Sequence, residues 1–241
     1  MTKQTTKHTE SFKIRANEVD AEGNCTLPAI CSLFQEIAGN HALLLNFDIT
    51  QLHEQNLTWV LHRMDIKIDR YPEWRETITI ETWPAAGDAL RAYRNYRVFG
   101  ENGEQIGRSL SYWMMINMET RRPARMPKEV LDLRLSNIDH VIPVKTTRLK
   151  PFNEADTEIH FTVRKSDLDM NRHVNNARYV EWMLETYPDN QASQIHEIDI
   201  IFMQESIAGD KIISQQTQHN SHTKHKLKNQ NGTVLAIAEC S

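Results

Sequence analysis

The sequence predicts an α+β protein in which an antiparallel sheet wrapped around one helix occurs twice in tandem. In each half, an amphipathic helical pattern is followed by several strand patterns. Hairpin signals rather than further helices separate these strands, which favours antiparallel pairing. The residues of the two halves also match in the same order, which indicates an internal duplication.

The matching residues stand at offsets that shrink along the chain, from 149 through 134 to 129 positions. Shrinking offsets in a fixed order are typical of two copies of which the second has shorter loops, whereas chance matches would scatter. The matches are Arg15 with Arg164, Asp20 with Asp169, Glu36 with Glu185, Asp65 with Asp199, Ile78 with Ile212, and the hairpin turn Asn102-Gly103 with Asn231-Gly232.

Each copy opens with a strand and a turn, after which apolar residues recur with the 3.6-residue period of a helix. In copy one this stripe is Leu27, Ile30, Leu33, Phe34, Ile37, Ala38, His41, Leu44 and Leu45. In copy two it is Ala177, Val180, Met183, Leu184 and Tyr187. Strand patterns follow each helix, for example at residues 77–83 and 199–202.

A proline-rich stretch separates the two copies. Between residues 119 and 157 stand Pro123, Pro127, Pro143 and Pro151, with one short helical pattern at residues 128–135. We therefore expect an N-terminal domain at residues 1–125, a linker at residues 126–157 and a C-terminal domain at residues 158–241.

Composition argues against several classes of protein. The formal net charge of −4 gives no general reason to expect nucleic acid as a partner. No window approaches the ~18 apolar residues that a membrane span needs, and the first twelve residues lack the apolar core of a signal peptide. Cys25, Cys31 and Cys240 form no CxxC pair, which fits a reducing compartment. We expect a cytoplasmic protein that binds neither nucleic acid nor membrane.

Residues 166–185, SDLDMNRHVNNARYVEWMLE, crowd polar groups at the start of the second helix. Asn and Asp cap helix starts, which accounts for one or two of these residues but not for His173 among them. A helix start flanked by Asn, His and carboxylate groups can hold an oxyanion, orient water and move protons, which is the equipment for acyl hydrolysis. The GxSxG, GxGxxG and GxxxxGK[ST] motifs are absent from the sequence. Their absence disfavours a serine-triad hydrolase, a Rossmann dinucleotide-binding protein and a P-loop protein.

The run DLDMNRHVNNARYVEWMLE resembles the signature of the acyl-acyl carrier protein thioesterases of plants and bacteria. The segments FQEIAGNHA, WVLHRMDIKIDRYPEWRETITIETWP and RRPARMP are similar to the same family, so the resemblance spans nearly the whole chain. It implies a double hot dog fold, in which each half is a sheet wrapped around a helix. The implied activity is hydrolysis of fatty acyl-acyl carrier protein, which releases free fatty acid, ends chain elongation and needs no cofactor.

The resemblance places the catalytic residues of the family on Asp169, Asn171, His173 and Glu205. It implies that Glu205 acts as a general base on a water that Asn171 and His173 position, while Asp169 orients this network. The backbone amides at the helix start are expected to bind the oxyanion. Direct attack by the carboxylate, which gives an anhydride, is an open alternative. The Cys that often follows the Glu in the plant branch is Ser206 here, which excludes a cysteine nucleophile at that place.

Copy one lacks the polar cluster, since Glu22-Gly-Asn-Cys-Thr stands where copy two has Asn171-Arg-His-Val-Asn. The family places the acyl pocket in the N-terminal half, so the helical stripe there is expected to line it together with Trp59, Met64, Trp74 and Trp83. Without the resemblance these residues are plain core. The sequence does not determine the preferred chain length or unsaturation of the acyl group.

The resemblance implies acyl carrier protein as the partner, and an acidic carrier needs a basic docking surface. Two clusters are candidates, with a merely solvated linker as the alternative. They are Arg121, Arg122, Arg125 and Lys128, and then Lys145, Arg148 and Lys150. Two copies in one chain can already form the pair that single-domain relatives obtain by dimerising, so both a monomer and a homodimer are open.

Three other activities compete with this function: an acyl-CoA thioesterase, a hydratase or dehydratase of acyl thioesters, and a non-catalytic acyl-binding regulator. Hydratases also use a His and a carboxylate, but the D-x-N-x-H-x-N-N run favours hydrolysis. His219, His222 and His225 have the spacing HxxHxxH. Because alternate side chains of a strand face opposite ways, we expect no metal site there.

Overall fold

The computed structural model describes residues 7–133, 140–188 and 195–241. The chain divides into two compact units, which we call the N-terminal unit (residues 1–25 and 32–144) and the C-terminal unit (residues 26–31 and 145–241). The domain limits expected from the sequence remain a proposal. The helix expected at residues 128–135 is the short α3, Lys128–Leu131, and residues 134 and 135 lie outside the described part of the chain.

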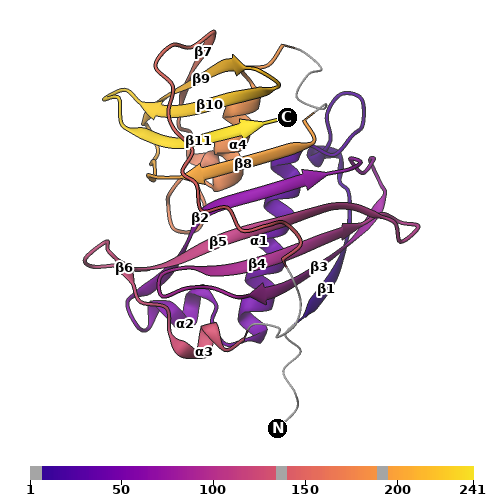
Figure 1. Ribbon diagram of the computed structural model, residues 1–241, viewed down its shortest axis with the longest axis vertical. Helices are drawn as coiled ribbons and strands as arrows, with labels where there is room; N and C mark the ends of the chain where they lie inside the picture. The colour runs from indigo at the N-terminus through magenta and orange to yellow at the C-terminus, as the bar shows by residue number, and fades with distance from the viewer. Residues whose placement is uncertain (1–6, 134–139, 189–194) are drawn as a thin grey trace. The chain divides into compact units, whose positions relative to one another are not determined.

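The sheet of the N-terminal unit is antiparallel, with the strand order β1-β3-β4-β5-β2. Figure 1 shows helix α1 running along one face of this sheet. The elements are β1 (His8–Lys13), a 3-10 turn (Ala16–Glu18), α1 (Leu27–Leu44), α2 (Ile49–His53), β2 (Leu57–Ile68), β3 (Thr77–Ala85), β4 (Ala92–Phe99), β5 (Gln105–Asn117), β6 (Pro123–Ala124), which pairs with β5, and α3.

The sheet of the C-terminal unit repeats this plan in the order β7-β9-β10-β11-β8. Helix α4 lies on one face of it (Figure 1). The elements are β7 (Thr157–Thr162), a 3-10 turn (Lys165–Asp167), α4 (Asn176–Leu184), β8 (Glu197–Phe202), β9 (Lys211–His219), β10 (His222–Asn229) and β11 (Val234–Cys240).

The duplication predicted from the sequence is confirmed by the strand registers. His8 pairs with Thr82 in the first sheet, and Thr157 pairs with Gln216 in the second, at the offsets of 149 and 134 positions. Even an irregularity is repeated. A register shift falls between Val98 and Phe99 on β4 and recurs 129 positions later, between Leu227 and Lys228 on β10. The residues that pair are therefore equivalent between the copies, position by position.

Most residues of the predicted helical stripes are buried, whereas Leu44 is exposed and Leu184 and Tyr187 are partly buried. In α1 and directly after it, eight of the nine stripe residues are buried, whereas Leu44 is 59% exposed. Leu44 occupies the last position of the helix, so its side chain extends beyond the sheet-covering face. In α4 the buried stripe residues are Ala177, Val180 and Met183. No helix in the described ranges is long and apolar enough to span a membrane.

The face of the first sheet that packs on α1 is identified by Phe34, whose ring lies 4.7 Å from that of Tyr96. Tyr96 pairs with Thr82, so the neighbouring Trp83 points to the opposite face, where Lys7 and Arg97 flank its ring. Trp74 is 48% exposed. Trp83, which is 1% exposed, thus lies on the face away from α1, and the expectation that these two tryptophans line an acyl pocket stays a proposal.

Two other pocket candidates have different surroundings. Met64 pairs with Ser111, whose hydroxyl contacts Tyr96, so Met64 lies on the face of the sheet that packs on α1. Trp59 donates from its indole nitrogen to the carbonyl oxygen of Phe47 at 2.8 Å. Trp59 pairs with Met115, which shares a face of β5 with Ser111, so the strand register places both Trp59 and Met64 on the face that packs on α1.

The three histidines at the β9–β10 hairpin do not converge. His219 and His222 pair at the exposed turn, whereas His225 is fully buried. The ring of His225 contacts the hydroxyls of Tyr187 at 3.1 Å and Thr186 at 3.4 Å, and burial lowers its pKa to about 3. Within the described residues there is no cluster of three or more side chains suited to a metal ion.

The buried His225 makes acid destabilising. An unfolded His takes up a proton near pH 6.5, whereas folded His225 stays neutral down to about pH 3, so stability is lost as the pH falls between these values. Between pH 7 and pH 5 we expect the free energy of unfolding to fall by about 2 kcal/mol from this group alone. Urea unfolding at both pH values measures this. A His225→Gln variant with the same pH dependence as the wild type would contradict it.

Candidate active site

The first segment of the candidate site is a tight turn between the 3-10 helix and α4. The Asp169 carboxylate oxygen Oδ1 accepts from the backbone amides of Asn171 at 2.8 Å and His173 at 3.2 Å. The amide of Asp169 donates in turn to the carbonyl of His173 at 2.7 Å. Arg172, between them, has a φ of +64°, a left-handed conformation. One carboxylate thus holds the turn that presents the Asn171 and His173 side chains.

The second segment follows β8 and carries Glu205. The amide of Val174 donates to the carbonyl of Ser206 at 2.8 Å, which fixes this segment beside the turn. The His173 Nε2 atom then lies 3.3 Å from a Glu205 carboxylate oxygen, and these side chains are 30% and 36% exposed. The structure therefore brings together His173 and Glu205, which the sequence alone could not place near one another.

A buried tyrosine also fixes the second segment, and sequence reasoning did not identify it. Tyr179 of α4 donates from its hydroxyl to the carbonyl of Gln204 at 3.2 Å. Burial raises its pKa to about 12, so the phenol stays protonated and remains a donor. A tyrosine on the buried face of a predicted helix needs a partner for its hydroxyl, which is the signal that could have drawn attention to it.

The base of the turn is anchored by Asp167, whose side chain is 1% exposed. Its carbonyl accepts from the amide of Asn175 at 2.9 Å, and its carboxylate contacts the Arg164 guanidinium at 2.8 Å. Burial alone would raise the pKa of the Asp167 carboxyl, but the hydrogen bonds and charge of Arg164 outweigh burial, so the pKa is lowered. Asp167 is therefore ionised at neutral pH and holds Arg164.

The N-terminal unit contains the same turn without the site. Asp20 Oδ1 accepts from the amides of Glu22 at 3.1 Å and Asn24 at 2.8 Å, and Gly23 has a φ of +87°. The amide of Cys25 donates to Pro72 at 2.7 Å, as that of Val174 does to Ser206. The positions of His173 and Glu205 are thus taken by Asn24 and Tyr71. The backbone is common to both copies, and the chemistry-bearing side chains are not.

Most backbone amides at the start of α4 already have acceptors. Asn175 caps the helix by accepting from the amide of Ala177 at 2.9 Å, and the amide of Arg178 donates to the Asn175 carbonyl at 2.9 Å. From residue 171 to residue 178, only the amide of Asn176 has no acceptor among the described residues. Of the backbone amides expected to bind the oxyanion at the helix start, only that of Asn176 is therefore available.

The remaining side chains of the site differ in their exposure and in their hydrogen-bond partners. The Asn171 amide group is partly exposed and makes no hydrogen bond with the described part of the chain. Ser206, next to Glu205, is only 2% exposed. Asp169 contacts backbone amides rather than the His173 ring. Asn171, His173 and Glu205 are therefore the groups able to meet a substrate.

Comparisons with known proteins agree with this geometry. The models of the acyl-ACP thioesterase N-terminal and C-terminal domains match residues 5–133 and 151–241. The palmitoyl-acyl carrier protein thioesterase of Gossypium hirsutum is 34% identical over 193 residues, 74% of this chain and 46% of the relative. Oleoyl-acyl carrier protein thioesterase 1 of Arabidopsis thaliana is 31% identical over 218 residues, 83% of this chain and 60% of the relative. The chain thus spans about half of the length of these curated relatives.

Solved structures match over the full length. The acyl-ACP thioesterase from Bacteroides thetaiotaomicron has a TM-score of 0.89 and 27% identity, covering 100% of this chain and 99% of that one. The 12:0-ACP thioesterase from Umbellularia californica has a TM-score of 0.86 and 26% identity, covering 100% and 98%. Two antiparallel sets of strands in the same order, each with its own helix, together with this structural match define a double hot dog protein. The chain belongs to the acyl-ACP thioesterase family.

Substitutions of Asp169 test whether this residue only holds the turn or whether its negative charge also takes part in the reaction. Asp169→Ala removes the acceptor of two amides, so we expect faster hydrogen exchange in residues 169–174, a stability loss of about 1–3 kcal/mol and lower activity. Asp169→Asn keeps an oxygen acceptor and is expected to keep the turn and most of the activity.

Asp20→Ala is the matched control for this test. It should loosen the equivalent turn at residues 20–25 and leave turnover unchanged, because that copy lacks His173 and Glu205. If Asp169→Asn keeps normal exchange protection but abolishes turnover, the charge of Asp169 takes part in the chemistry and the purely positional role is wrong.

Proposed function

We propose that this chain hydrolyses the thioester of fatty acyl-acyl carrier protein, which releases free fatty acid and ends chain elongation. The carrying observation is the 3.3 Å contact between His173 and Glu205 beside the Asn171 side chain, in the one copy where the shared turn carries such groups. Membership of the acyl-ACP thioesterase family supports the same activity.

In the proposed mechanism, Glu205 takes a proton from a water as the water oxygen bonds to the thioester carbonyl carbon. The Asn171 amide group and the His173 ring position the water and the carbonyl. The carbonyl oxygen becomes an oxyanion, for which the amide of Asn176 is the available backbone donor. A single preorganised donor of this kind is worth about 3–4 kcal/mol. The intermediate then expels the thiolate, which takes up the proton, and the fatty acid leaves.

A second chemistry uses the same residues. Glu205 would attack the carbonyl carbon itself and expel the thiolate, and water would then hydrolyse the mixed anhydride. The 36% exposed Glu205 carboxylate suits either route. A single turnover in ¹⁸O-labelled water identifies the anhydride route if water attacks the Glu205 carbonyl, because label then stays in the protein. General-base catalysis, and attack of water on the fatty acyl carbonyl of the anhydride, both place the label in the fatty acid.

Other activities of the same site have different products. Hydrolysis of either acyl-carrier or acyl-CoA thioesters releases a free thiol, whereas hydration or dehydration of the acyl chain releases none. Thiol release on a panel of carrier-bound acyl groups of varied length therefore tests the class of reaction and the preferred chain. A non-catalytic acyl-binding regulator would give neither product, and the intact polar turn disfavours it.

The partner is proposed to be acyl carrier protein. Of the two basic clusters expected to dock it, Lys128 forms an ion pair with Asp132, and Lys145 lies 3.2 Å from Asp199. Part of the positive charge of each cluster is thus neutralised within the chain. A cytoplasmic location, a monomeric or homodimeric state and an acyl-binding role of the N-terminal domain stay proposals. The relatives from Gossypium hirsutum and Arabidopsis thaliana are named as chloroplastic, so family membership alone does not imply a cytoplasmic location.

The proposed roles predict large losses for three substitutions. Glu205→Gln and Glu205→Ala remove the base, and His173→Asn installs the residue of copy one. We expect each to lower kcat for acyl-carrier thioester by at least about 100-fold while the fold is retained, because a positioned general base contributes roughly 10²–10⁴-fold. Thiol release and thermal unfolding measure the two quantities. Turnover near that of the wild type in either Glu205 variant or in His173→Asn would remove that residue from the mechanism.

A further inference from the structure

Three exposed apolar side chains flank the candidate site. Met170 is 80% exposed, Met203 is 51% exposed and Ile207 is 54% exposed. Met170 stands between Asp169 and Asn171, and the other two stand two residues before and after Glu205. They account for three of the eight large apolar side chains that are exposed in the described residues. A gathering of such side chains at one place is typical of a binding surface.

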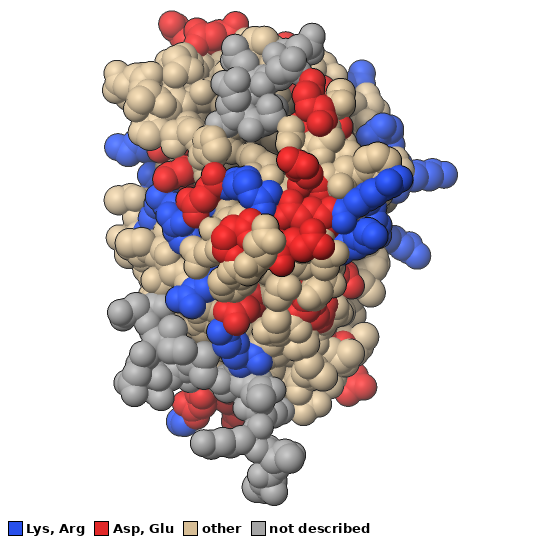
Figure 2. All heavy atoms as spheres, turned by 90° about the vertical axis from the view of Figure 1, so that its right-hand side faces the viewer, with Lys and Arg blue, Asp and Glu red and all other residues tan. Residues whose placement is uncertain are grey.

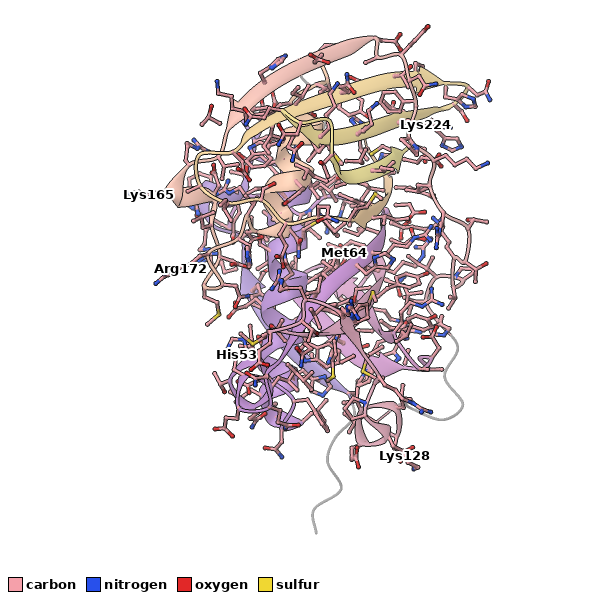
Figure 3. The ribbon with its side chains drawn as sticks, turned by 90° about the vertical axis from the view of Figure 1, so that its left-hand side faces the viewer. His53, Met64, Lys128, Lys165, Arg172 and Lys224 are labelled. Carbon is pink, nitrogen blue, oxygen red and sulfur yellow. The ribbon has the colours of Figure 1, made fainter. Side chains whose placement is uncertain are left out.

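Two positive charges accompany them. Arg172 and Lys165 are exposed, and neither forms an ion pair within the part of the chain that the structure describes. Figure 3 shows both side chains projecting outward on the same side of the C-terminal unit. Their neighbours Arg164 and Arg178 contact Asp167 and Glu181 instead. Arg172 and Lys165 are thus available to an acidic partner.

This arrangement differs from the mixed charges elsewhere on the molecule. On the face in Figure 2, acidic and basic side chains lie side by side. In the N-terminal unit, Arg70 pairs with Glu76 and Glu104, for example. Cations of that kind are neutralised within the chain and offer little to an acidic protein.

The turn at Arg172 does not need an arginine side chain for its fold. A left-handed φ costs a residue with a Cβ roughly 1 kcal/mol or more, and glycine avoids this cost. Copy one has Gly23 at the equivalent position with the same sign of φ. Other non-glycine residues share this conformation, among them Arg75, where copy two has Gly209. The conformation therefore makes Arg172→Gly a substitution that the turn can accept.

The whole set is specific to the copy with the site. The amides of Asp69 and Arg70 both donate to Ile106, and those of Met203 and Gln204 both donate to Leu235, so these positions are equivalent. Copy one has Ala16, Ala21, Gly23, Asp69 and Glu73 where copy two has Lys165, Met170, Arg172, Met203 and Ile207. Small and acidic residues have thus been exchanged for apolar and basic ones, as the catalytic side chains were.

We propose that Lys165, Met170, Arg172, Met203 and Ile207 form a docking face for the acyl carrier protein. The inference rests on the proposed function. The apolar side chains would lose water against the carrier, and the two cations would meet its acidic side chains. The carrier is tethered to its acyl group by a phosphopantetheine arm, so it must bind within the reach of that arm from Glu205. Met203 and Ile207 flank that residue along the chain, and Arg172 directly precedes His173. The charges of Lys165 and Arg172 form no ion pair within the described chain.

The test compares one acyl group on three carriers: acyl carrier protein, coenzyme A, and pantetheine, which lacks both protein and phosphate. The double variant Lys165→Ala with Arg172→Gly installs copy-one residues, and Met170→Ala with Met203→Ala and Ile207→Ala removes the apolar part. For each we expect KM for the carrier-protein substrate to rise about 10-fold or more with kcat within about twofold, and KM for acyl-pantetheine to stay unchanged. Lys13→Ala, an exposed cation on β1, is the matched control without effect.

Four results would overturn the docking face. An equal loss on acyl-pantetheine would mean that the residues act on the chemistry. A loss on carrier protein and coenzyme A alike, but not on pantetheine, would mean that they bind a phosphate. A rise in KM for Arg122→Glu with Arg125→Glu, but not for the docking-face variants, would move docking to the linker. A changed oligomeric state in size-exclusion chromatography would assign the apolar part to a second copy of this chain.

Failure of the proposed function would look different. If the wild type released thiol from none of the three substrates, the hydrolase proposal would fail, and docking would be decided by calorimetry with a carrier protein that bears a non-hydrolysable acyl amide. Binding that the docking-face variants weaken at least about 10-fold would support the docking face by itself. Binding by wild type and variants with equal affinity, or no binding, would overturn it.

Discussion

The Asp169 carboxylate supplies the acceptor that a tight backbone turn cannot supply for itself. Its Oδ1 atom accepts two amides, and the turn that results sets the direction of the Asn171 and His173 side chains. Asp167 anchors the residue before α4, and Val174 joins the turn to the segment of Glu205. Without these contacts the site would be a set of polar residues on two unconnected loops. Its geometry is therefore a consequence of capping chemistry.

The equivalent turn of copy one shows which part of this design is structural. Asp20 caps it in the same way, and Arg15 with Glu18 repeats the anchor of Arg164 with Asp167. Selection on folding alone would keep these residues in both copies, because loss of a capping acceptor leaves amides unpaired. His173, Glu205 and Arg172 have no such duty in copy one, where Asn24, Tyr71 and Gly23 stand. Comparison of the two copies thus separates the residues that hold the turn in both from those proposed to act in the site.

The same separation explains what the sequence could and could not predict. Offsets between matching residues predicted that a sheet with a helix occurs twice, and the strand registers of the structure repeat at the same offsets. Capping at the start of α4 was predictable, and Asn175 performs it, whereas the acceptor role of Asp169 in the preceding turn is visible only in the structure. Only the family resemblance suggested that His173 and Glu205 act together. Their contact depends on a backbone hydrogen bond from Val174 to Ser206, which the sequence pattern does not reveal. The sequence did not predict on which face of the sheet Trp83 lies, or which acceptors bind the amides at the start of α4. Both depend on side-chain direction, which composition and hydrophobic period do not determine.

Partial exposure of the His173 and Glu205 pair has a consequence for catalysis. At 30% and 36% exposure the two side chains remain hydrated, so the pair costs little desolvation and solvent reaches the place where the proposed mechanism needs a water. Hydration also weakens the electrostatic stabilisation of an oxyanion, which is strongest where water is excluded. The site therefore gains from a substrate that covers it. Met170, Met203 and Ile207 stand around the pair, and an acyl carrier bound on them would exclude water at the moment when charge develops. Once the carrier is bound it covers the pair in the wild type and in the docking-face variants alike, so the apolar side chains act on KM rather than on kcat.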